Sequence, residues 1–215
     1  MTPDHESEIE TCLAYEVLRD PDNWIGGPST LWLDAFLHGA SFRRDFAGPS
    51  IPDSLISGVL NEPAFFQQFI DATGDPTLTI RWATAIAMTD LSLAAGFAKL
   101  KAAAIDWHGK YGVTATTVSN SLPHQDRDNF WQRFAERPAM YMGDSNGWTL
   151  YCFLNGMKRG GDWLHLNEMP RLDEVFGGIQ LQSERAYGSP FAAFRVYDAR
   201  RLLEWVGLPD RTSTC

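Results

Sequence analysis

The stretch PDNWIGGPSTLWLDAFLHGASFRRD, residues 21–45, recurs 117 positions later as PAMYMGDSNGWTLYCFLNGMKRGGD, residues 138–162. The two stretches align without a gap and share seven identical residues among 25 positions. The identities pair Pro21 with Pro138, Gly26 with Gly143, Leu33 with Leu150, Phe36 with Phe153, Leu37 with Leu154, Gly39 with Gly156 and Asp45 with Asp162. Similarity at one fixed offset indicates an internal duplication.

The matched residue types are those that a helix–loop–helix needs. Proline cannot continue a preceding helix, and the first glycine allows a turn with positive φ. The Leu-x-x-Phe-Leu spacing packs one face of a second helix, and we expect the second glycine, Gly39 or Gly156, to end it. The helices before these stretches agree as well, since Leu13 and Val17 align with Phe130 and Phe134. Independent convergence on the same local chemistry is the alternative.

We therefore predict a mainly α fold in which residues 1–215 form a single globular domain of two related helical halves. The halves cover about residues 10–108 and 127–207, are joined by a linker at 109–126, and pack about an approximate two-fold axis. The clearest helix begins after Asp90 and continues to Trp107. A short helix is expected at 170–176. Minor β segments stay open at 77–80, 114–118 and 179–182.

Length and composition exclude several classes of protein. The 215 residues are 44% hydrophobic and include 8 Trp and 13 Phe, which is enough apolar surface for a packed core. No run of about 18 uncharged apolar residues could span a membrane. The acidic first ten residues are unlike the basic start of a signal peptide, so we expect a soluble, cytoplasmic protein.

The formal net charge of −9 is concentrated at one end of the chain. Residues 1–22 carry a formal charge of −6, with seven acidic residues and Arg19. Binding to nucleic acid requires clustered Lys and Arg, so this balance argues against a nucleic-acid ligand. It favours either a basic protein partner or simple solubility.

Chemically active residues do not form a recognisable motif. Cys12, Cys152 and Cys215 are scattered, and the five histidines lack metal-ligand spacing, so neither a metal nor a cofactor is predicted. His38 and Asp34 could be a base and its orienting carboxylate, or simply neighbours on a helix surface. Four aromatic residues could form a binding surface or fill the core: Tyr141, Trp148, Trp163 and Trp205.

The second copy also resembles a known group of proteins. Its string Arg137-Pro-Ala-Met-Tyr-Met-Gly143, followed by Phe153-Leu-Asn-Gly156, is similar to small uncharacterised bacterial proteins built on Arg-Pro-x-Met-Tyr-x-Gly and Leu-x-x-Phe-Leu-x-Gly. The first copy has the same order of motifs, including Phe66-Gln-Gln-Phe69 and Arg81-Trp-Ala83, but begins with Asp20-Pro-Asp-Asn-Trp24. The second copy has Ser189-Pro-Phe-Ala-Ala-Phe194 where Trp-Ala is expected. The resemblance implies a toxin–immunity setting without an assigned activity.

These observations together predict a non-enzymatic immunity or antitoxin-like protein that occludes a basic protein toxin, such as a nuclease effector. The expected partner-binding residues are Glu6, Glu8, Glu10, Glu16, Asp20, Asp22, Asp34 and Asp45. The expected structural signature is Pro21, Gly26, Phe36, Gly39, Pro138, Tyr141, Gly143, Phe153 and Gly156. One alternative is a small-molecule-binding protein or enzyme with a cleft between the halves, lined by His38, Arg81, Arg159 and Arg195. Another is a scaffold subunit that pairs with itself; the oligomeric state stays open.

Overall fold

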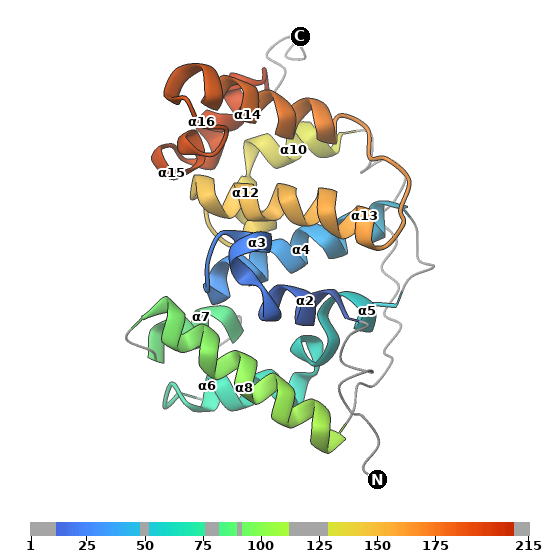
Figure 1. The fold of residues 1–215 in the computed structure, drawn as a ribbon, viewed down its shortest axis with the longest axis vertical. Coiled ribbons are helices and arrows are strands. Elements are labelled where there is room, and N and C mark those ends of the chain that lie inside the picture. Colours follow the sequence, from blue (N-terminus) through green and yellow to red (C-terminus); the bar gives the residue numbers. More distant parts are fainter. Residues whose placement is uncertain (1–11, 48–51, 76–81, 90–91, 112–128, 209–215) are drawn as a thin grey trace. The chain divides into compact units, whose positions relative to one another are not determined.

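The computed structural model describes residues 12–47, 52–75, 82–89, 92–111 and 129–208, and they form a mainly α fold (Figure 1). Within those ranges the chain forms helices and turns without a strand, apart from one isolated antiparallel bridge between Asn146 and Asp198. Contacts divide the chain into two compact units, which are described separately. Unit 1 contains Met1–Leu37 and Ser50–Ser119, and unit 2 contains His38–Pro49 and Asn120–Cys215.

Unit 1 is built from short helices around an apolar core. Its elements are α2 (Leu13–Arg19), α3 (Pro21–Ile25), the first part of α4 (Thr30–Ala47), α5 (Ser54–Ser57), the 3-10 helix η1 (Gly58–Asn61), α6 (Pro63–Asp71), α7 (Trp82–Thr89) and α8 (Leu93–Tyr111). Two buried hydroxyl groups also bind backbone carbonyls across this core. Thr30 donates to Ala83 at 3.3 Å, and Tyr15 donates to Ala104 at 3.2 Å.

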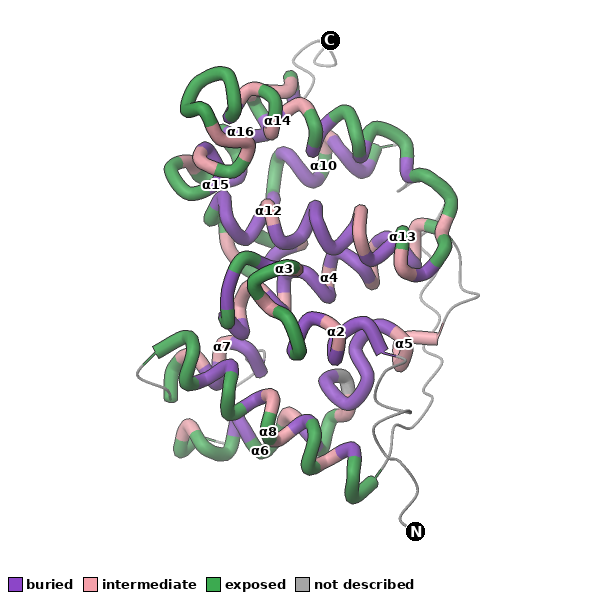
Figure 2. The backbone as a smooth tube through the Cα atoms, viewed as in Figure 1, coloured by how far each residue is buried: buried purple, intermediate pink, exposed green. Residues whose placement is uncertain are grey.

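Unit 2 contains the remainder of α4 and the C-terminal helices. These are α10 (Phe130–Glu136), α11 (Pro138–Met142), α12 (Gly147–Asn155), the π-helix η2 (Gly156–Gly160), α13 (Gly161–Trp163), α14 (Leu172–Tyr187), α15 (Ala192–Val196) and α16 (Ala199–Trp205). Helix α12 is buried along nearly its whole length (Figure 2). Residues 38–49 belong to this unit, although the alignment assigns them to the first repeat.

An aromatic cluster forms part of the core of unit 2. The ring of Phe134 stacks on Phe153 with centroids 5.2 Å apart, and it lies 5.4 Å from both Phe130 and Tyr141. Phe42, from the part of α4 that belongs to this unit, packs on Phe130 at 4.3 Å. Such ring pairs add about 0.5–1.5 kcal/mol each beyond the burial of their area.

Two glycines in unit 2 allow backbones to approach more closely than a side chain would permit. A Cβ on Gly39 would lie 2.0 Å from the carbonyl oxygen of Phe153 on α12. A Cβ on Gly147 would lie 2.2 Å from the carbonyl oxygen of Tyr197 and 2.6 Å from that of Phe194. Both positions therefore require glycine because of tertiary packing.

The expectation that Gly39 ends its helix is wrong, whereas α12 ends at Asn155, directly before Gly156. Helix α4 continues through Gly39 to Ala47. The chain after Gly156 also stays helical, through η2 and α13, to Trp163. The physical reason for a glycine at position 39 is the close crossing of α4 and α12. This packing requires glycine in the middle of a helix, so the residue does not mark a helix end.

Local structure agrees between the two aligned stretches. Shifted by 117 positions, the bounds of α2 and α3 coincide with those of α10 and α11, and the first residue of α4 coincides with that of α12. Pro21 and Pro138 are the first residues of α3 and α11, where proline's missing N–H costs nothing. Gly26 and Gly143 end these helices with left-handed φ values of 78° and 89°.

The hydrogen bonds at the helix junctions repeat as well. The N–H of Asp20 donates to Glu16 at 3.2 Å, and the aligned N–H of Arg137 donates to Arg133 at 3.2 Å. The bonds that begin the next helices, from Leu33 to Ser29 and from Leu150 to Asn146, both measure 3.0 Å. This agreement is what a duplication requires. Common origin and a two-fold arrangement of the halves stay hypotheses.

Other predicted boundaries differ from the structure. Helix α8 extends to Tyr111, so the predicted linker cannot begin at 109, and residues 112–128 lie outside the described part. The possible strands at 77–80 and 114–118 also lie outside it. The short helix expected at 170–176 and the possible strand at 179–182 are both wrong, because α14 is one helix over Leu172–Tyr187. Its buried face of Val175, Phe176, Ile179 and Ser183 offsets the cost of two internal glycines, about 1 kcal/mol each.

Candidate functional site

The predicted partner-binding carboxylates fall into three groups. Glu6, Glu8 and Glu10 lie outside the described residues. Asp34 and Asp45 are both partly buried, and Asp45 pairs with the buried Arg44 at 2.7 Å. The remaining three belong to unit 1, with Glu16 on α2, Asp22 on α3 and Asp20 between the two helices. We call them the acidic junction.

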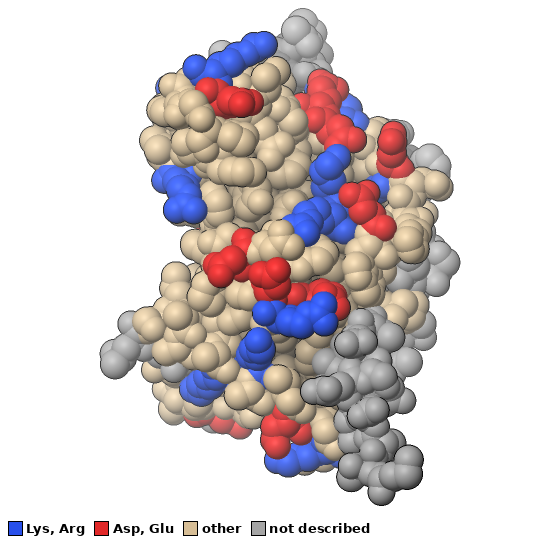
Figure 3. All heavy atoms as spheres, viewed as in Figure 1, with Lys and Arg blue, Asp and Glu red and all other residues tan. Residues whose placement is uncertain are grey.

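The acidic junction presents carboxylates to solvent. Asp20 and Asp22 are exposed, and Glu16 is partly exposed beside Arg19, with which it pairs at 2.5 Å. Asp20 also has a structural role, because its side chain accepts a hydrogen bond from the N–H of Asn23 and caps α3. Figure 3 shows acidic side chains gathered over α2 and α3.

Two of the three aligned positions in unit 2 carry the opposite charge, and the third, Ala139 opposite Asp22, is neutral. Glu16 aligns with Arg133, and Asp20 aligns with Arg137. Both arginines are exposed, and so is the neighbouring Met140, at 71% of its surface. We call Arg133, Arg137, Met140 and the half-buried Tyr141 the basic junction. One local backbone structure therefore carries two carboxylates in unit 1 and two guanidinium groups in unit 2 at these positions, while Arg19 and Glu136 reverse the exchange at the position between them.

The described cysteines are poor candidates for a nucleophile. Cys12 is buried and its thiol donates to the carbonyl of Ile56 at 3.3 Å. Burial raises the pKa of Cys12 to about 12 and raises that of Cys152 well above its usual value. Since the thiolate is the reactive form, both thiols stay protonated at neutral pH.

Thiol labelling checks this assignment. In a Cys215→Ser variant at about pH 8, we expect Cys12 and Cys152 to react with a disulfide reagent about a thousandfold more slowly in the folded chain than in denaturant. The measurement is the release of the chromophoric leaving thiol with time, with the denatured chain as the control. Rapid labelling of either thiol in the folded chain would contradict the assignment.

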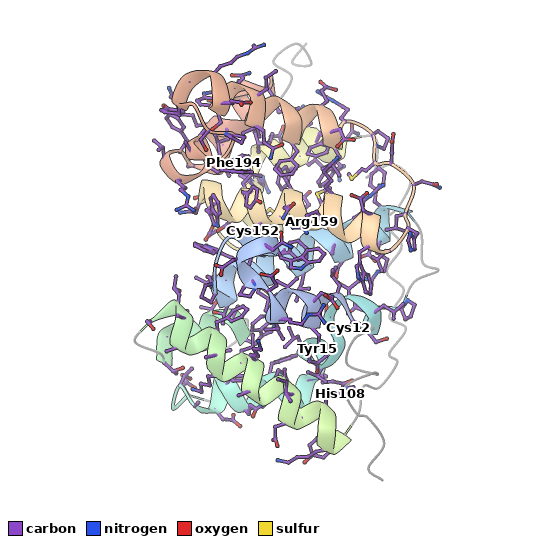
Figure 4. The ribbon with its side chains drawn as sticks, viewed as in Figure 1. Cys12, Tyr15, His108, Cys152, Arg159 and Phe194 are labelled. Carbon is purple, nitrogen blue, oxygen red and sulfur yellow. The ribbon has the colours of Figure 1, made fainter. Side chains whose placement is uncertain are left out.

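Two other buried polar groups lie near Cys12 in unit 1. Figure 4 labels Cys12, the N-cap residue of α2, together with Tyr15 on α2 and His108 on α8. The ring of His108 meets the edge of Tyr15 at 5.8 Å, and its Nδ1 atom lacks a hydrogen-bond partner within the described structure. Burial raises the pKa of Tyr15 above its usual value, so the phenol stays neutral. This cluster packs the interior of unit 1.

The four candidate aromatics do not form one binding surface. Trp148 is buried at 7% exposure beneath the guanidinium of Arg195, whose Cζ lies 4.4 Å from the ring centroid. Tyr141 belongs to the aromatic cluster around Phe134. Trp163 and Trp205 are partly exposed on other elements. Core packing therefore accounts for Trp148, whereas the half-buried Tyr141 contacts the cluster and also reaches the surface.

The described residues among those proposed to line a small-molecule cleft each have a different structural setting. His38 donates from Nδ1 to the carbonyl oxygen of Tyr141 at 3.1 Å, which holds its ring within unit 2. Arg195 covers Trp148, and Arg159 lies in the π-helix. Arg81 lies outside the described residues.

Sequence reasoning missed a buried arginine in unit 2. Arg43 is only 4% exposed and packs against Gly161, where a Cβ would lie 3.0 Å from its Nε atom. Burial lowers the pKa of Arg43, and the nearby carboxylates of Asp162, Asp173 and Glu168 act in the opposite direction. The aligned sequences contain a hint of this packing. At the offset of 117 positions, the two large residues Arg43 and Arg44 align with the two glycines Gly160 and Gly161.

Among the described residues, no group of three His, Cys, Asp or Glu side chains is placed to hold a metal ion. None of the helices in the same ranges is long and apolar enough to cross a membrane. Comparison of the chain with protein-family models, curated proteins and solved structures found no match.

Proposed function

We propose that this chain is a non-enzymatic binding protein of the immunity or antitoxin type, which occludes a basic protein toxin such as a nuclease effector. The observation that carries the proposal is the acidic junction, where Glu16, Asp20 and Asp22 lie on and between two consecutive helices of unit 1. The resemblance of the sequence to small proteins from toxin–immunity settings supports the same function. The proposed place of action is the cytoplasm.

The proposed mechanism is electrostatic steering followed by occlusion. A nuclease must present Lys and Arg to phosphate groups, so its active-site cleft has a positive potential. Exposed carboxylates accelerate association with such a cleft, and they fix the orientation of the complex more than they add affinity. Asp22 is well suited to this role because it is exposed and α3 is capped by Asp20 instead.

Capture from native cells tests the proposal. With the full chain as bait, we expect one stoichiometric partner rich in Lys and Arg, whose catalytic activity falls to background when the two proteins are equimolar. Purified partner mixed with serum albumin, an unrelated acidic protein, serves as the control. A partner that remains fully active in the complex, or the recovery of acidic partners only, would contradict occlusion.

A further inference from the structure

The basic junction of unit 2 has the side-chain types of a protein interface. Arginine, methionine and tyrosine are enriched where proteins bind one another. Here Arg137 is exposed, Met140 is 71% exposed, and Tyr141 is half-buried against the aromatic cluster of the same unit. An exposed methionine beside a guanidinium and a phenol ring supplies both an apolar anchor and a charge.

Arg137 occupies a position that local stability does not favour. It is the N-cap of α11 and, unlike Asp20 at the N-cap of α3, it makes no side-chain capping bond. A positive charge at a helix N-terminus also opposes the helix dipole. The backbone angles of the two N-caps are nearly the same, with φ −134° and ψ 69° at Asp20 against φ −141° and ψ 59° at Arg137. An aspartate at position 137 would therefore fit the backbone and cap α11. Helix stability does not explain why the residue there is an arginine.

The acidic junction supplies the complementary surface. The two junctions share element bounds, and the backbone bond from Asp20 to Glu16 is repeated from Arg137 to Arg133. They carry opposite charges at these two aligned positions, and the exposed Arg19 and Glu136 between them are exchanged in the other sense. We propose that the basic junction of unit 2 is an interface for a second copy of this chain, docked through that copy's acidic junction. Self-association would then cover the surface proposed for the toxin, so the two partners would compete for the same carboxylates.

Charge exchange tests this interface. At about 50 mM salt and about 0.3 mM protein, we expect the mass of the wild-type chain in solution to rise above the monomer, and to return to it at about 0.5 M salt. The variants Asp22→Arg and Arg137→Asp should each be monomeric alone. Mixed together, they should associate again, because one keeps the basic junction and the other keeps the acidic one. Multi-angle light scattering or sedimentation measures these masses.

The controls separate binding from folding. Arg137→Asp introduces a capping carboxylate like that of Asp20, so its thermal midpoint should rise by about 2–4 °C while self-association is lost. Met140→Ser should weaken association about tenfold and leave its salt dependence unchanged. A wild-type chain that stays monomeric, or single variants that associate as the wild type does, would overturn the proposal. The inference does not rest on the proposed function, because these masses are measured without a toxin.

Discussion

Replacing Gly39 by alanine should destabilise the chain by more than about 4 kcal/mol, because overpacking against a backbone cannot be relieved by a rotamer change. The new methyl group would lie 2.0 Å from the carbonyl oxygen of Phe153, 2.9 Å from its carbonyl carbon and 3.0 Å from the nitrogen of Met157. Alanine is a better helix former than glycine, so the whole loss would come from separating α4 from α12 within unit 2.

Urea denaturation followed by far-UV circular dichroism measures this loss. The matched control is Gly177→Ala on α14, where a Cβ would meet nothing within 4 Å. There we expect no loss and a gain of up to about 1 kcal/mol. If Gly39→Ala costs less than about 1 kcal/mol, the close crossing of α4 and α12 is wrong.

Truncating Phe134 to alanine should cost about 3–5 kcal/mol. The side chain is fully buried, and its ring touches those of Phe130, Tyr141 and Phe153 at centroid distances of 5.4, 5.4 and 5.2 Å. Alanine would remove these ring contacts and leave a cavity in the core of unit 2. The same residue aligns with Val17 in unit 1, which is also fully buried.

The comparison for this prediction is Phe191→Ala. Phe191 is 39% exposed and contacts Tyr151 at 5.5 Å, so its truncation should cost no more than about 1.5 kcal/mol. Both free energies come from urea unfolding curves with unchanged slopes. Equal costs at the two positions would show that the cluster around Phe134 is not a core of unit 2.

Helices and their ends were predictable where local chemistry decides them. Pro21 and Pro138 begin helices, Gly26 and Gly143 end them with positive φ, and Asp198 caps α16 through the N–H of Arg201 at 2.9 Å. Each of these depends on residues within one turn of the chain. A mainly α fold follows from the same local patterns.

The failures occur where tertiary packing decides. Gly39 has the sequence pattern of a helix end, but it is a crossing point, because its neighbour Phe153 is 114 positions away. Gly177 and Gly178 suggest a break, yet the buried face of α14 holds the helix together. Arg43 was overlooked because the space that it occupies is created by Gly161 on another element.

The candidate site was predictable in composition but not in arrangement. The sequence identifies Glu16, Asp20 and Asp22 as acidic, and the structure adds that Asp20 is a cap and Asp22 is exposed. The charge exchange between Glu16 and Arg133 was visible in the aligned sequences. The structure adds that these two positions have the same place in matching helices, so the exchange changes the charge of one local surface and leaves its backbone unchanged.

The association rate constant of the captured partner tests the central claim, that the acidic junction steers a basic protein, most directly. The variant Glu16→Gln/Asp22→Asn should slow association about tenfold at low salt and change dissociation little, and the difference should vanish at about 0.5 M salt. The matched control is Asp71→Asn/Asp106→Asn, which removes the same charge from exposed positions on α6 and α8. Its association rate should fall less than twofold. Equal slowing by both variants, or no slowing by the first, would contradict the account.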